Sequence, residues 1–229
     1  MSYPKLTAGG VIVSIVFAFA VCAGGAEKPV VVPGLVGGTS SADVFGNHGF
    51  FGAARACFQR YPFSEFQAGA GARQKNCLAD YMKRGGATPR AIAFMRAAPV
   101  PAAIAAVRNY GAAAVVYARM MWADGSDGWA IVGRSGVMVP LWLPPAIDHD
   151  PAYRAFVAGH PGVSLWSDAL AWPPSASATG GAQLVFVFSL KVCHACARLG
   201  AATVVYSFNR DGRYQGVRLK RIEASSATP

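Results

Sequence analysis

The chain has few acidic residues and none of the motifs by which many enzymes are recognised from sequence. Its 229 residues include 11 Asp and Glu against 21 Lys and Arg, which gives a formal net charge of +10. The patterns G-x-S-x-G, H-E-x-x-H, G-x-G-x-x-G and the phosphate-binding P-loop do not occur. After Glu27 the only glutamates are Glu65 and Glu223, so a glycosidase with paired carboxylates would have to rely on aspartates. These absences favour a protein of non-catalytic type.

The N-terminal segment has the layout of a secretory signal peptide. Lys5 supplies a positive charge, an apolar run extends from Val11 to Val21, and small residues follow up to Ala26. The run is shorter than the roughly 20 apolar residues that a bilayer span needs, and no later run approaches that length. We therefore expect residues 1–26 to be removed, leaving a periplasmic or secreted bacterial protein without a transmembrane span.

Cys22 raises an alternative for this segment. A bacterial lipoprotein is cut just before a cysteine that is then lipidated, usually after a small residue. Val21 precedes Cys22 and Phe19 lies two positions further back, which is a poor match to that pattern. Lipidation of Cys22 is therefore kept as the minor alternative to ordinary cleavage.

The other four cysteines predict two disulfides. An even number of cysteines in an oxidising compartment favours disulfide bonds, and four cysteines allow three pairings. The pairing that keeps each bond within one half of the chain joins Cys57 to Cys77 and Cys193 to Cys196.

The Cys193–Cys196 pair also permits other chemistry. Haem attachment needs a histidine directly after the second cysteine, but Ala197 stands there. Structural zinc needs two further ligands, and no second close pair of Cys or His occurs, so we expect no metal and no cofactor. A redox centre needs a helix starting at the second cysteine to lower the thiol pKa, whereas Gly200 and the β-branched residues after it predict a strand. Thiol–disulfide oxidoreductase activity remains the alternative to a structural bond in a loop between two strands.

The hydrophobic periodicity changes from helical to strand-like along the chain. Thr88 as N-cap before Pro89 predicts one helix start, and Asp150 before Pro151 predicts another. We expect an α+β fold in which N-terminal short helices pack on an antiparallel sheet of about six strands. Pro140 places its strand at a sheet edge or at a bulge.

Changes in composition along the chain predict the domain organisation. The expected divisions are a signal peptide (1–26), a flexible lead-in (27–49), a single α+β domain (50–222) and a tail (223–229). An alternative division places an internal boundary within residues 173–181.

Positive charge is concentrated in two regions, residues 51–108 and 191–221, on either side of a mildly acidic middle. Such a field concentrates anions near a surface. The alternative to a binding surface is that the arginine content reflects coding bias and solubility. Nucleic acid is not expected as a partner of an exported chain, so if the charge serves binding, the partner is an anionic surface or an acidic protein. The residues predicted to bind it are Arg213, Arg218, Lys220 and Arg221.

Overall fold

The computed structural model describes residues 36, 43–45, 47–61, 70–120, 127–167, 175–177 and 180–225. The predicted signal peptide, Cys22 and most of the predicted lead-in and internal boundary lie outside these residues. Within the described part of the chain, no helix is long and apolar enough to cross a membrane.

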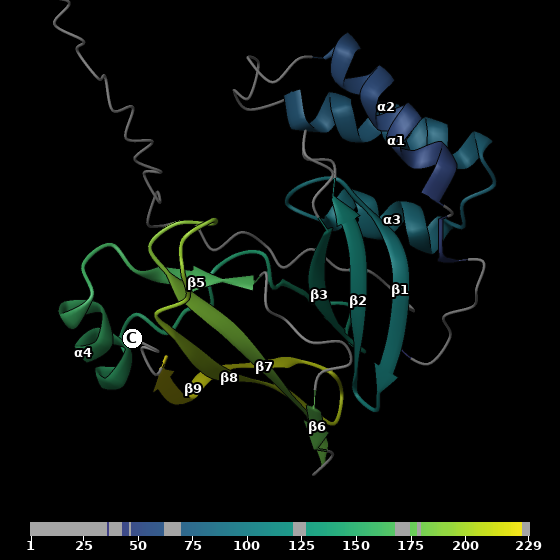
Figure 1. The fold of residues 1–229 in the computed structure, drawn as a ribbon. Helices are drawn as coiled ribbons and strands as arrows, with labels where there is room; N and C mark the ends of the chain where they lie inside the picture. Colours follow the sequence, from purple (N-terminus) through teal and green to yellow (C-terminus); the bar gives the residue numbers. More distant parts are fainter. Residues whose placement is uncertain are drawn as a thin grey trace, which may run out of the picture.

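The described residues form helices and strands, which confirms the α+β class (Figure 1). The helices are α1 (Asn47–Arg60), α2 (Ala70–Arg84), α3 (Pro89–Ala97) and α4 (Pro151–Gly159). The strands are β1 (Ala102–Tyr110), β2 (Ala113–Met120), β3 (Asp127–Gly133), β4 (Met138–Pro140), β5 (Ser164–Trp166), β6 (Ser175–Ser177), β7 (Gly181–Lys191), β8 (Gly200–Asn209) and β9 (Tyr214–Ala224). α1 begins three residues before the expected domain start at residue 50, and β9 continues two residues into the expected tail.

The strands build two antiparallel sheets, so the expectation of one sheet of about six strands is wrong. The first sheet has the order β1-β2-β3-β4, and β4, which contains Pro140, lies at its edge as expected. The second sheet has the order β5-β7-β8-β9, with β6 paired to β7. The physical reason lies in β2, where consecutive residues from Ala113 to Val116 are all buried. A strand that buries both faces needs a covering layer on each side.

The two faces of the first sheet pack against different layers. Val116 and Val132 lie in one core cluster with Phe94 of α3. Val115 and Ile131, on the opposite face, lie in a larger cluster with residues of β7 and β8. The molecule therefore has three layers, with the first sheet between the helices and the second sheet.

α1 and α2 pack on α3 through a third core cluster and complete the helical layer. Phe50 and Ala54 of α1 meet Leu78 and Met82 of α2 there, together with Met95 of α3. The inward residues of each helix recur at helical spacing, which leaves the opposite face of α1 and α2 to solvent.

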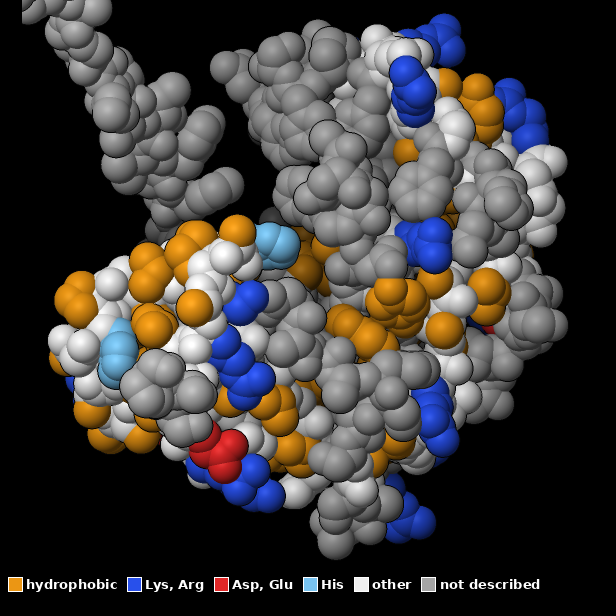
Figure 2. Space-filling view, in the orientation of Figure 1, with side chains coloured by type: hydrophobic (Ala, Val, Ile, Leu, Met, Phe, Trp, Pro, Cys, Tyr) orange, Lys and Arg blue, Asp and Glu red, His pale blue; other side chains and the backbone are white. Residues whose placement is uncertain are grey.

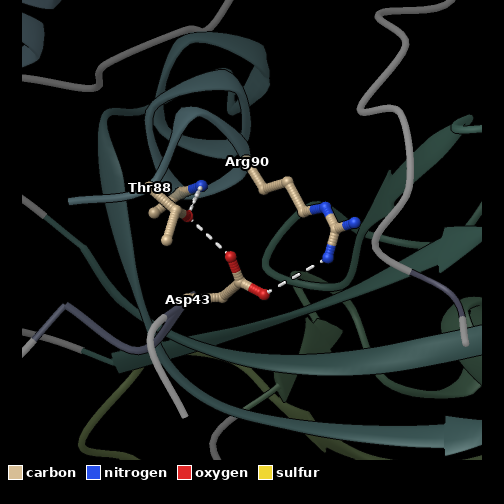
Figure 3. A network of polar contacts seen from close by, with 4 residues as sticks. Asp43, Thr88 and Arg90 are labelled. Atoms are coloured by element: carbon tan, nitrogen blue, oxygen red, sulfur yellow. Dashed lines mark hydrogen bonds and ion pairs between the residues drawn. The ribbon is translucent and has the colours of Figure 1, made fainter. Parts of the chain in front are cut away.

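The start of α3 is fixed by a polar network that includes the buried residue Asp43 (Figure 3). Thr88 accepts a hydrogen bond from the Ala91 amide, as an N-cap does, and Pro89 occupies the first helical turn as predicted. The Thr88 hydroxyl donates to Asp43 Oδ1 at 2.6 Å, and Arg90 lies 3.8 Å from Asp43 Oδ2. Asp43 is 2% exposed, and these contacts hold this residue against the start of α3.

The turn between β8 and β9 docks on the first sheet. Ser135 donates a hydrogen bond to the Gly212 carbonyl at 2.7 Å, and a Cβ atom at Gly133 would collide with that same carbonyl. Gly212 has a φ of 74°, which favours glycine. This close approach holds the β8–β9 turn against the first sheet.

Candidate functional site

The four predicted anion-binding residues all belong to β9 or to the turn before it. Arg213 immediately precedes β9, and Arg218, Lys220 and Arg221 lie within it; all four are exposed. Among the described residues β9 pairs only with β8, so it forms an edge of the second sheet. The four cations therefore lie along one edge strand and the turn that precedes it.

A β-bulge at Lys220 decides which of these side chains share a face. Leu219 pairs with Val204 and Arg221 pairs with Thr203, so Lys220 is the extra residue between them. Without the bulge, simple alternation would point Arg221 inward together with Leu219. With it, Arg221 joins Arg218 on one face, whereas simple alternation would place Arg218 with Lys220.

That face points away from the first sheet. Val204 and Tyr206 of β8 belong to the core between the two sheets, so their neighbours Thr203 and Val205 point to the opposite face. Arg221 pairs with Thr203 and Arg218 with Val205. We call this face, with Arg218 and Arg221, the outer face of the second sheet.

Arg221 is held in place by two neighbours on the outer face. Its Nε donates a hydrogen bond to Thr203 Oγ1 at 3.4 Å and lies 3.3 Å from Glu223 Oε1. Arg221 and Glu223 are 60% and 55% exposed, so solvent screens this ion pair. The sequence predicted Glu223 to lie in the tail. The alternation of charged Arg221, apolar Ile222 and charged Glu223 is the signal that could have placed it in a strand.

The second candidate site is the loop between β7 and β8, which carries the Cys193–Cys196 disulfide. The loop joins two antiparallel strands, as the sequence predicted. Leu199 donates its amide hydrogen bond to the Leu190 carbonyl, and the loop bends where Cys196 donates to the Cys193 carbonyl. No helix starts at Cys196, because the described chain enters β8 at Gly200. The helix N-terminus that would lower a thiol pKa is therefore missing at this pair.

Three contacts place an aromatic pair beside this disulfide. The Trp166 and His194 rings meet edge to face with centroids 5.5 Å apart. Trp166 Nε1 donates to the Lys191 carbonyl at 3.2 Å, and Lys191 Nζ donates to the His194 carbonyl at 3.3 Å. Sequence reasoning did not find Trp166, because it reaches this loop only through the pairing of β5 with β7.

The other disulfide, Cys57–Cys77, lies in the helical layer. It joins α1 to α2, and Cys57 is fully buried in their shared core cluster. Its environment differs from that of Cys193, which is exposed. The structure thus contains both predicted disulfides, one internal and one at the surface.

Among the described residues, no group of three or more His, Cys, Asp or Glu side chains is placed to hold a metal ion. No protein-family model, curated protein sequence or solved structure matches the chain. The geometry of β9 and of the β7–β8 loop is therefore the basis for assigning a function.

Proposed function

We propose that the chain is an exported bacterial envelope or secreted protein of non-catalytic type, which binds an anionic surface through β9. The two disulfides and the lack of a membrane-spanning helix in the described part of the chain are compatible with a location outside the cytoplasm. The binding residues are Arg213, Arg218, Lys220 and Arg221.

The observation that carries this proposal is the shared direction of Arg218 and Arg221. Both lie on the outer face of the second sheet, opposite the small side chains of Val205 and Thr203. Both arginine side chains are exposed and are therefore accessible to an anionic surface. Lys220 and Arg213 add charge beside this face, and Glu223 is the one acidic residue of β9.

Binding of this kind depends on salt. Exposed charges attract an anionic surface over about one Debye length, which is roughly 10 Å at 0.1 M salt and 3 Å at 1 M. Each basic residue near an anionic bilayer contributes about 1 kcal/mol. We therefore expect co-sedimentation with phosphatidylglycerol vesicles at low salt, loss of binding at high salt, and no binding to phosphatidylcholine vesicles.

The variant Arg213→Gln/Arg218→Gln/Lys220→Gln tests the role of β9. It should bind phosphatidylglycerol vesicles at least about 100-fold more weakly, from three contributions of about 1 kcal/mol. Arg96→Gln/Arg108→Gln/Arg154→Gln is the matched control, because it removes the same charge from α3, β1 and α4. Equal binding of the two variants to the vesicles would show that β9 is not the binding site. Binding of the wild-type protein to an acidic protein but not to the vesicles would identify a protein partner instead of a surface.

One observation favours a second function, thiol–disulfide exchange. Cys193 is exposed at the β7–β8 loop, where an external thiolate can reach its sulfur. The absence of a helix at Cys196 weighs against this function. Turnover in an insulin-reduction assay that disappears in Cys193→Ser/Cys196→Ser would establish it.

A further inference from the structure

A second basic surface lies on the helical layer, and the proposed binding strand does not include it. Arg55 and Arg60 of α1 and Lys83 and Arg84 of α2 are exposed. Asp80 is the one acidic residue in the sequence of these two helices. The inward faces of both helices are occupied by the core cluster they share with α3, so these cations point away from the protein interior.

This surface also carries an exposed aromatic side chain. Tyr81 is 39% exposed, and the Arg84 guanidinium lies 4.7 Å from the centroid of its ring. Tyrosine beside Lys and Arg is the combination found where proteins meet the headgroup region of a bilayer, because the ring is amphipathic and the cations attract anionic lipids. This chemistry fits an anionic phospholipid surface.

The two basic surfaces face opposite directions. The helices cover one face of the first sheet and the second sheet covers the other. Arg218 and Arg221 point away from the first sheet on one side, and the outer faces of α1 and α2 point away from it on the other. Figure 2 shows Lys and Arg side chains over the helices at the upper right and over the second sheet at the lower left, and further Lys and Arg side chains at the lower right.

We propose that one molecule bridges two anionic phospholipid bilayers, one held by α1 and α2 and the other by β9. This rests on the proposed function, because the β9 contact is one of the two. A bilayer is flat on the scale of this molecule and cannot wrap around it. Two surfaces that face apart therefore cannot both contact the same bilayer.

Clustering of vesicles tests bridging separately from binding. Wild-type protein is added to phosphatidylglycerol vesicles, co-sedimentation reports binding, and light scattering reports clustering. Lys83→Gln/Arg84→Gln removes two of the four cations of the helical surface, and Arg218→Gln/Arg221→Gln removes two of the four cations of the β9 site. Each variant should still co-sediment through its intact surface, but should need about 30-fold more protein for half-maximal clustering, since each basic residue accounts for about fivefold in affinity. Arg108→Gln/Arg154→Gln, which removes the same charge elsewhere, should cluster vesicles like the wild type.

Every other outcome contradicts bridging in an identifiable way. Wild-type protein that binds vesicles without clustering them overturns bridging and leaves the proposed function standing, whereas protein that does not bind overturns both. Clustering that is lost in only one of the two double variants indicates a dimer with one lipid-binding surface per molecule. Circular dichroism of each variant checks that the substitutions have not unfolded the protein.

Discussion

Arg221 on β9 lies against Thr203 on β8 and Glu223 on its own strand, with Nε 3.4 Å from the threonine hydroxyl and 3.3 Å from the carboxylate. The first contact orients the guanidinium on the outer face, and the second offsets part of its charge. A binding surface that includes a carboxylate is weaker than one without it, because the carboxylate repels the anionic partner.

Glu223→Gln should therefore strengthen binding to phosphatidylglycerol vesicles. The substitution keeps the shape of the side chain and removes one negative charge, which by analogy with a basic residue is worth up to about 1 kcal/mol, or about fivefold in affinity. Co-sedimentation at low salt measures the change, and Asp148→Gln on an exposed loop is the control. A Glu223→Gln variant that binds more weakly than the wild type would show that β9 is not the contact surface.

Asp43→Ala should destabilise the protein by about 1–3 kcal/mol, because it removes a buried acceptor and leaves the Thr88 hydroxyl without that partner. Urea denaturation followed by circular dichroism measures the free energy of unfolding. Asp148→Ala, on the surface, should change it by no more than about 0.5 kcal/mol. Equal stability of the two variants would mean that Asp43 does not anchor the segment before α1 to α3.

The two disulfides should contribute unequally to stability. Cys57–Cys77 closes a loop with a sequence separation of 20, and its loss should cost about 3 kcal/mol in the chain-entropy account. Cys193–Cys196 has a separation of 3, and Cys193→Ser/Cys196→Ser should cost about 1–2 kcal/mol. The two double serine variants are compared by urea denaturation. A larger loss for the Cys193 and Cys196 variant would contradict this assignment.

Tyr206 should make the protein sensitive to alkaline pH. It is 1% exposed, and its hydroxyl has no hydrogen-bond partner among the described residues. Burial, together with the nearby Tyr214, raises the pKa of Tyr206 above its usual value. A raised folded pKa contributes stability that is present below the unfolded value, about 10, and is lost as pH rises above it.

The variant Tyr206→Phe tests this directly. It should unfold at a higher pH than the wild type, and at neutral pH it should be as stable or slightly more stable, since the lost hydroxyl has no partner among the described residues. Tyrosinate absorbance and circular dichroism are recorded together from pH 8 upward. Ionisation of Tyr206 before unfolding would contradict its burial.

The sequence predicted the features that depend on neighbouring residues. Thr88 and Asp150 cap helices as their positions before Pro89 and Pro151 indicated. The loop position of Cys193 and Cys196 followed from the strand-forming residues on both sides.

Features that depend on distant contacts could not be predicted in this way. The bulge at Lys220 arises from pairing with Thr203 and Val204, and nothing in the local alternation marks it. The division into two sheets depends on which apolar strand faces pack together. Strand propensity does not specify that packing. Asp43 belongs to a segment rich in glycine and serine, and its burial depends on α3, 45 residues away along the chain.

The most direct test of anionic-surface binding through β9 is hydrogen–deuterium exchange of the full chain with and without phosphatidylglycerol vesicles. The edge amides of β9 that do not bond to β8 exchange readily in the free protein and should be shielded when a bilayer covers this strand. We predict slower exchange in peptides that cover residues 213–224 and unchanged exchange in α4. Unchanged exchange in residues 213–224, under conditions where the protein co-sediments with the vesicles, would contradict the proposal.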